Sequence, residues 1–280
     1  AVIGNLIDNN FSALADDISS IEDHLILWLD ATNINATSNH DISDAVTVNY
    51  WVDLSGNLNN AFASDASDAN PQYSDEGLST YPRISFDGND YMNIIHNRGA
   101  FEMQEFTVFI IGTQNSNSNE NTYLSTDDGS NSGWQIKKDS SDKINFITRS
   151  VSSVDSSVGA IGSPQVVVGR YSEREPNKRL WLDGELILHT SIANNNSTIN
   201  YDNSYVGIGT SFNGNLNLDS YLNGNISEIL VFDDALEDHV IDQISFYLSE
   251  KWELSVASAD LDFDGDGYTN SEEDLLDGSG

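Results

Sequence analysis

The stretch DFDGDGYTNSEE, residues 262–273, carries oxygen-bearing side chains at the spacing of a calcium-binding loop. With its first Asp as position 1, acids or an amide fall at positions 1, 3, 5, 9 and 12, and Gly267 takes position 6, where the chain must turn sharply. Short side chains and one backbone carbonyl would then surround a single ion, which the long terminal Glu closes with two oxygens. The predicted ligands of one Ca²⁺ are Asp262, Asp264, Asp266, the Tyr268 carbonyl, Asn270 and Glu273.

An acidic linker is the alternative interpretation of this stretch, because the chain is rich in Asp throughout. The segment SVASADL before the loop lacks a helical pattern, so the entering helix of a full EF-hand is missing. The loop is therefore similar to the calcium loops of thrombospondin type-3 or dockerin-like repeats. That resemblance implies a calcium-rigidified connection between modules rather than a calcium sensor.

A second stretch, STDDGSNSGW (residues 125–134), combines acids with an aromatic residue between two expected strands. Asp127 and Asp128 offer carboxylates to a cation, and Trp134 offers a flat apolar face to a sugar. Tyr123 or Tyr171 would supply a second aromatic face. The alternative is that Trp134 opens a strand and faces the core, as most aromatic residues of a sandwich do.

Familiar catalytic patterns are missing from the sequence. Retaining glycosidases need two carboxyl groups about 5–5.5 Å apart, which a strand motif such as Glu-x-Asp-x-x-Glu supplies, and no such motif occurs. The His residues form no His-x-His or His-x-x-x-His pair, and there is no Gly-x-Ser-x-Gly elbow. We expect no enzymatic activity, and a glycoside hydrolase is the least favoured of the functions considered.

The charge balance restricts the partners of the chain. Its 280 residues include 45 Asp and Glu against 11 Lys and Arg, a formal net charge of -34, so the surface repels nucleic acid and anionic membranes. Such a surface suits a saline extracellular setting, where salt screens the repulsion. No apolar run reaches the ~20 residues of a membrane-spanning helix, and without Cys there are no disulfides. We therefore expect a secreted or cell-surface protein that is not embedded in a membrane.

The secondary structure expected from residue 25 onward is mainly β. Short runs rich in apolar and β-branched residues alternate with clusters of Asn, Ser, Gly and Asp, a texture typical of an antiparallel sandwich. The pair Asp183-Gly184 lies between the apolar runs RLWL and ELIL and predicts a two-residue hairpin turn.

Helices are expected at the two ends of this β-rich region. Residues 3–22 carry one apolar stripe, so they predict a helix docked on its own domain or on a neighbouring one. A second amphipathic helix is predicted over residues 235–252, with Asp234 and Glu237 as its capping box and Lys251 in its last turn. Its apolar positions are Leu236, Val240, Ile244, Leu248 and Trp252.

Six pieces of sequence occur in a recognisable order: LILWLDATN, WVDLSGNLNNA, PRISFDGNDYM, RLWLDGELI, GNISEILVFDDALED and YLSEKWEL. In that order the chain resembles the laminin-G-like, concanavalin-A-like modules of bacterial secreted and surface proteins. The resemblance implies an all-β, jelly-roll sandwich of two antiparallel sheets, in agreement with the strand pattern. It divides the chain into an N-terminal helical segment (1–23), the sandwich (24–254), and a linker with the calcium loop (255–280).

Members of that family mostly bind glycans or proteins through loops at a sheet edge, often beside Ca²⁺. The resemblance therefore implies an extracellular, non-catalytic adhesion or binding module for a glycan or surface ligand. The alternative is a structural spacer or surface-polymer subunit without a small ligand, in which the N-terminal helix contacts a neighbouring domain or subunit. An aromatic-lined groove would favour the first interpretation.

Overall fold

The computed structural model describes most of the chain between residues 21 and 255. The described ranges are 21–63, 69–75, 81–95, 97–115, 119–127, 132–149, 152–156, 162–174, 177–190, 198–201, 206–212 and 218–255. The predicted N-terminal helix, apart from its last two residues, and the whole predicted calcium loop lie outside these ranges. Asp128 also lies outside them.

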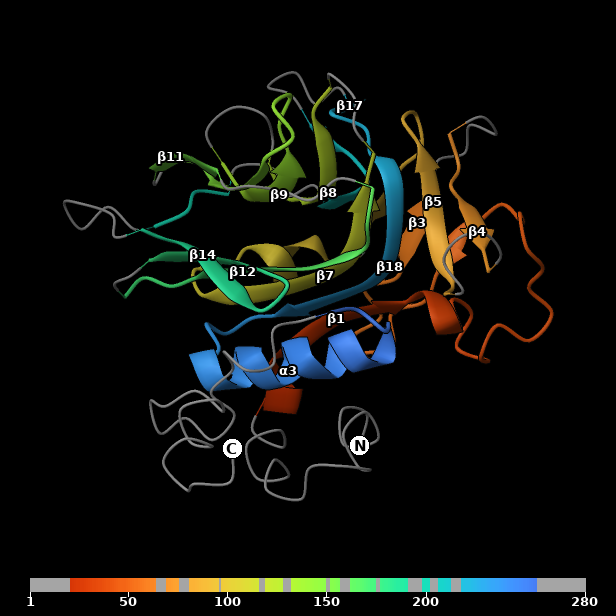
Figure 1. Cartoon of the computed structure of the whole chain (residues 1–280), viewed down its shortest axis with the longest axis horizontal. Coiled ribbons are helices and arrows are strands. Elements are labelled where there is room, and N and C mark those ends of the chain that lie inside the picture. Colours follow the sequence, from red (N-terminus) through yellow and green to blue (C-terminus); the bar gives the residue numbers. More distant parts are fainter. Residues whose placement is uncertain are drawn as a thin grey trace.

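Two large antiparallel sheets form the body of the protein (Figure 1). The first sheet has the order β14 (Glu185–Thr190), β13 (Lys178–Leu182), β12 (Gln165–Tyr171), β7 (Phe106–Gln114), β18 (Asn223–Phe232), β5 (Arg83–Asp87) and β4 (Gln72–Ser74), and β1 (Leu25–Asp30) also pairs with β18. The second sheet has the order β11 (Ser152–Ser156), β10 (Ile144–Thr148), β9 (Trp134–Lys138), β8 (Asn121–Ser125), β15 (Val206–Ile208), β6 (Met92–Ile94), β3 (Ala61–Ala63) and β2 (Tyr50–Trp51). The expected all-β jelly-roll sandwich is thereby confirmed.

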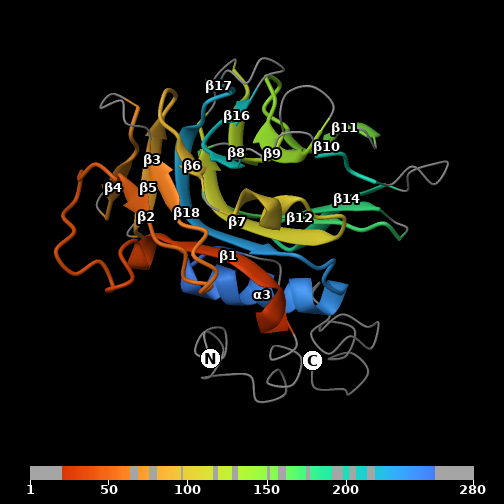
Figure 2. The same cartoon turned by 180° about the vertical axis from the view of Figure 1, so that it is seen from behind.

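Smaller elements complete the described structure. A two-stranded ribbon of β16 (Ser211–Phe212) and β17 (Leu218–Asp219) stands beside the second sheet, as Figure 2 shows from behind. The short 3-10 helices are η1 (Glu22–His24), η2 (Ala31–Asn33) and η3 (Arg98–Phe101), and the α-helix is α3 (Asp238–Lys251). Within the described ranges, no helix is both long and apolar enough to cross a membrane.

The core lies between the two sheets and is closely packed. A Cβ atom added to Gly112 of β7 would lie 2.6 Å from Cε1 of Tyr123, which reaches across from β8. A Cβ on Gly169 of β12 would likewise lie 2.9 Å from Cδ1 of Ile136 on β9. Glycine at these two positions lets large side chains of the second sheet approach the backbone of the first sheet. These contacts also show that Tyr123 of β8 and Ile136 of β9 point toward the first sheet.

The predicted hairpin turn is confirmed. Asp183 has a φ of 51° and Gly184 a φ of 83°, so both residues adopt the left-handed conformation that a two-residue turn of this type requires. Trp181 pairs with Leu186, and Leu182 pairs with Glu185, on either side of the turn. A local sequence signal therefore determines how β13 is joined to β14.

Helix α3 packs against the outer face of the first sheet beside β1 (Figure 1). Val240, Ile244 and Leu248 of the predicted apolar stripe are buried, and Lys251 is in the last turn as expected. The predicted capping box is wrong, because the helix begins at Asp238 and no side chain caps it.

The residues just before α3 are held by β7 and by their own side chains instead. The Leu236 amide donates to Oγ1 of Thr107 at 3.0 Å, and the Ala235 amide donates to the Asp234 carboxylate at 2.8 Å. Those two amides are therefore satisfied outside the helix, which begins only after them.

Candidate functional site

The outer face of the second sheet carries an ordered row of side chains. Because Ile136 points toward the first sheet, the neighbouring Gln135 points outward. The cross-strand register continues this row from Gln135 to Ser125, Gly207 and Asn93, and then to Phe62 and Tyr50 at the β2 edge. Six strands therefore contribute neighbouring residues to one outward face.

A pocket of about 340 Å³ opens on this face beside β6. We call it the aromatic pocket, and its lining residues are Tyr91, Asn93, Ile94, Ile95, Arg98, Val206, Phe212 and Leu218. Its walls are mainly apolar, and the Asn93 amide and the Arg98 guanidinium supply hydrogen-bond donors. This combination of apolar walls with a few polar groups is typical of small-molecule sites.

The ribbon of β16 and β17 forms one wall of the aromatic pocket. A Cβ on Gly207 would lie 2.9 Å from Cγ2 of Thr210 and 3.3 Å from Cε2 of Phe212. Because residue 207 is a glycine, the chain can fold back over the outer face of the second sheet. Phe212 then lies next to Gly207, the residue that pairs with Asn93. A larger residue there would push the aromatic wall away from the sheet.

A larger, more polar cavity of about 640 Å³ lies on the other side of the same ribbon. We call it the polar pocket, and it is lined by Asp87, Gly88, Asn119, Glu120, Asp219, Ser220, Tyr221 and Asn223. Adjacent residues of β17 line different pockets, Leu218 the aromatic one and Asp219 the polar one. The rings of Tyr91 and Tyr221, one from each pocket, have centroids 6.2 Å apart.

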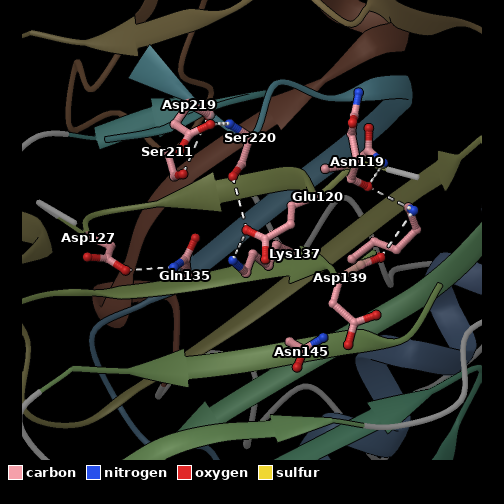
Figure 3. A network of polar contacts seen from close by, with 12 residues as sticks. Asn119, Glu120, Asp127, Gln135, Lys137, Asp139, Asn145, Ser211, Asp219 and Ser220 are labelled. Atoms are coloured by element: carbon pink, nitrogen blue, oxygen red, sulfur yellow. Dashed lines mark hydrogen bonds and ion pairs between the residues drawn. The ribbon is translucent and has the colours of Figure 1, made fainter. Parts of the chain in front are cut away.

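The carboxylates of the polar pocket are partly engaged by the protein itself. Glu120 forms an ion pair with Lys137 of β9 and accepts a hydrogen bond from the Ser220 hydroxyl at 3.2 Å, as Figure 3 shows. Asp219 accepts a hydrogen bond from the Ser220 amide at 2.7 Å. These contacts fix Glu120 and Asp219 in place at the wall of the polar pocket.

A third cavity of about 340 Å³ shares Asp87 with the polar pocket and includes Asp90. Burial raises the pKa of Asp90 to about 6, although the hydrogen bond from the Asp87 amide opposes this shift. The carboxyl of Asp90 therefore changes its charge at mildly acidic pH, close to the two pockets that flank the ribbon.

The aromatic residues predicted to contact a ligand are in the core instead. Trp134 is fully buried and stacks on Phe106 with ring centroids 4.7 Å apart, and Tyr171 lies on the same Phe106 at 5.7 Å. Tyr123 is 1% exposed and packs against Gly112 of the facing sheet. The structure corrects these three predictions, because alternation along β8, β9 and β12 turns the rings inward. The alternative interpretation of Trp134 as a core residue is confirmed.

Asp127 is also buried, and its carboxylate is occupied. Its Oδ2 accepts from Nε2 of Gln135 and from Nε of Arg149, each at 2.6 Å, and Figure 3 shows the first contact. Arg149 neutralises the acid, so Asp127 is a structural ion-pair partner rather than an open cation ligand. The second predicted acid, Asp128, lies outside the described residues.

The part of the chain that the structure describes contains no cluster of three His, Asp or Glu residues able to hold a metal ion. The predicted calcium ligands at 262–273 lie outside that part, so the calcium loop stays a prediction.

Residues of the aromatic pocket were not predicted as site residues. Tyr91, Asn93 and Arg98 follow one another closely in sequence, but Phe212 and Leu218 come from a segment more than a hundred positions later. The strands that bring them together have only two or three residues, too few for a periodic pattern. Tyr91 does belong to the motif PRISFDGNDYM, where it directly precedes β6. That position is the sequence feature that comes nearest to indicating the aromatic pocket.

The two sheets, their shared core and the outer helix define a jelly-roll β-sandwich of the kind found in lectin-type modules. No protein-family model matches the sequence, and no curated protein matches it. Solved structures do match the fold. The binding domain of botulinum neurotoxin DC in complex with SialylT aligns with a TM-score of 0.55 at 18% identity, covering 81% of this chain and 52% of that chain.

Two further similar structures come from sialidases. The Trypanosoma rangeli sialidase in complex with sialic acid aligns with a TM-score of 0.52 at 11% identity, over 83% of this chain and 34% of the sialidase. The CBM40 of Ruminococcus gnavus IT-sialidase, bound to alpha2,3 sialyllactose, aligns with a TM-score of 0.50 at 14% identity, over 58% of this chain and 95% of the CBM40. The chain thus spans about a third of the sialidase and about half of the toxin domain. At these identities the similarity establishes the fold alone.

Proposed function

We propose that this chain is a non-catalytic glycan-binding module whose ligand enters the aromatic pocket. The observation that carries the proposal is the composition of that pocket: aromatic and aliphatic walls around one amide and one guanidinium, on an outward sheet face. Apolar walls suit the C–H faces of a sugar ring, and Asn93 and Arg98 suit its hydroxyl or carboxylate groups. The similar toxin domain and CBM40, which were solved with glycan ligands, support the same class of ligand.

The non-catalytic part of the proposal rests on the sequence. The chain lacks the closely spaced carboxylate motif that most glycosidases use, and it spans only about a third of the similar sialidase. Purified protein should therefore release no sugar from a polysaccharide above a heat-inactivated control. Turnover that disappears when one Asp or Glu is replaced would contradict this.

We extend the proposal to a secreted or cell-surface location and to one Ca²⁺ in the 262–273 loop. The net charge of -34 and the six matching positions of that loop support these two points. In this arrangement the sandwich binds the glycan, the calcium loop stiffens the connection to a following module, and residues 3–22 contact a neighbouring domain.

Binding at the aromatic pocket is tested with an array of defined glycans. Asn93→Ala and Arg98→Ala should each lower affinity by about tenfold or more, because each removes hydrogen-bond donors at a desolvated contact. Arg174→Ala is the matched control, since it removes a cation from an exposed turn between β12 and β13 in the other sheet. The proposal fails if no glycan binds, which would favour the structural spacer, or if both pocket variants bind like the parent.

A further inference from the structure

An aromatic pair continues the outward face beyond the aromatic pocket. Asn93, which lines the pocket, pairs with Phe62 of β3, and Phe62 pairs with Tyr50 of β2. Residues that face each other across a ladder point to the same side of the sheet, so both rings share the face of Asn93. Neighbouring strands are about 4.8 Å apart, which places Tyr50 about 10 Å from Asn93 along the sheet. Figure 2 shows β2, β3 and β6 side by side at this edge.

The Tyr50 ring is held in place but remains open to solvent. Tyr50 is 40% exposed, and its ring centroid lies 5.0 Å from that of Phe62 at an interplanar angle of 56°. The next residue, Trp51, is fully buried, and its indole Nε1 donates to the Asp30 carbonyl at 3.1 Å. This buried anchor fixes β2, so the exposed ring needs little additional ordering when a ligand arrives.

We propose that Tyr50 and Phe62 form a second sugar subsite, so that the ligand is an oligosaccharide lying across β6, β3 and β2. This inference rests on the proposed function and specifies its ligand class. One sugar ring occupies the aromatic pocket beside Asn93, and the next ring or rings stack on the exposed face of Tyr50. Ile95, 48% exposed and also a lining residue of the pocket, adds exposed apolar surface just after β6.

The strongly negative net charge of the chain is compatible with a sugar that stacks on Tyr50. Stacking of C–H faces on an aromatic ring involves no ionic contact, so it does not require a basic surface on a chain with a net charge of -34. In the aromatic pocket Arg98 is the cationic lining residue, whereas the lining of the polar pocket includes Asp87, Glu120 and Asp219. We therefore place any anionic sugar of the ligand in the aromatic pocket and a neutral sugar on Tyr50.

A plain cross-strand aromatic pair is the competing explanation. Such pairs stabilise a sheet edge, and that role would require no ligand. The two explanations differ in their effect on binding, because a purely structural pair would not make affinity depend on the length of the glycan.

The experiment measures binding of Tyr50→Ala and Tyr50→Phe to an array of defined glycans of one to six sugar rings. Tyr50→Ala should weaken binding of glycans with two or more rings by about three- to tenfold and leave single sugars unchanged. Tyr50→Phe should bind like the parent, because it keeps the aromatic face. Leu186→Ala, at a position 41% exposed on β14 of the other sheet, is the matched control.

Thermal unfolding of each variant separates loss of binding from loss of folding. The inference is overturned if folded Tyr50→Ala binds long glycans like the parent, or if the parent binds single sugars as tightly as their oligomers. In either case a loss of binding in Asn93→Ala would show that the proposed function itself still holds. If the parent binds no glycan at all, the proposed function fails and this inference fails with it.

Discussion

Asp90 illustrates how burial changes the chemistry of a single residue. It is 5% exposed in the loop between β5 and β6, and its Oδ2 accepts a hydrogen bond from the Asp87 amide at 2.9 Å. Burial nevertheless raises the pKa of Asp90 from its ordinary value of 3.8 to about 6. A carboxyl with a raised pKa in the folded state binds its proton more tightly there than in the unfolded chain. Its stabilising contribution is therefore present below about pH 4 and is lost as the pH rises through about 6.

Asp90→Asn should remove this pH dependence. The amide oxygen can still accept the hydrogen bond from Asp87, but the side chain no longer has to ionise in a buried position. We expect the variant to match the parent near pH 4 and to be more stable by about 1–3 kcal/mol at pH 7. Urea unfolding at several pH values measures the difference. Glu185→Gln, at an exposed position on β14, controls for the loss of one negative charge, and a difference for Asp90→Asn that does not change with pH would contradict the expectation.

A buried charged cluster attaches α3 to the first sheet. Lys251, at the end of the helix, contacts Asp30 of β1 at 2.8 Å and Glu228 of β18 at 2.8 Å. Glu228 is 1% exposed and also accepts hydrogen bonds from the indoles of Trp28 at 2.7 Å and Trp252 at 2.6 Å. Burial raises the pKa of Glu228, and the charge of Lys251 opposes this shift. Lys251 therefore partly neutralises the negative charge of two buried carboxylates, and it links α3 to β1 and β18.

Lys251→Met should destabilise the protein strongly. Removing the cation leaves Glu228 and Asp30 buried without their partner, which costs about 3–5 kcal/mol. Methionine keeps the length and apolar character of the stem, so the loss is mainly electrostatic. Lys143→Met, at an exposed position between β9 and β10, is the matched control. Chemical denaturation should show a large loss for the first variant only, and equal stability of the two variants would show that the cluster does not hold α3.

We expect the sandwich and the predicted calcium loop to respond separately to Ca²⁺. The jelly-roll body has its own core, with large buried side chains contributed by both sheets. The six predicted ligand positions, by contrast, lie within twelve consecutive residues and need no side chain of the body. Calcium should therefore order the loop and change the stability of the body little.

Calorimetry should detect one Ca²⁺ per chain. Glu273→Gln removes a bidentate charged ligand, and Gly267→Val prevents the sharp turn, so each should weaken binding by at least about tenfold. Asp260→Asn, two residues before the loop, is the matched control. Chelation should expose the last ~20 residues to protease while the sandwich stays folded. Calcium binding that does not depend on Glu273 and Gly267 would leave the stretch an acidic linker.

Features of the fold whose signals are local can be predicted from the amino-acid sequence. The strands β7, β12 and β18 are runs rich in apolar and β-branched residues. These runs, the turn at Asp183-Gly184 and the stripe of α3 depend on neighbouring residues, so their patterns predict them. Three other features follow only from contacts in the folded chain: Trp134 faces the core, Lys251 contacts Glu228, and residues from 91–98 and 206–218 line one pocket. Those contacts join segments far apart in the chain, and the pocket in addition depends on strands of only two or three residues. Such short strands carry no periodicity, because their position is set by pairing with distant partners rather than by their own sequence.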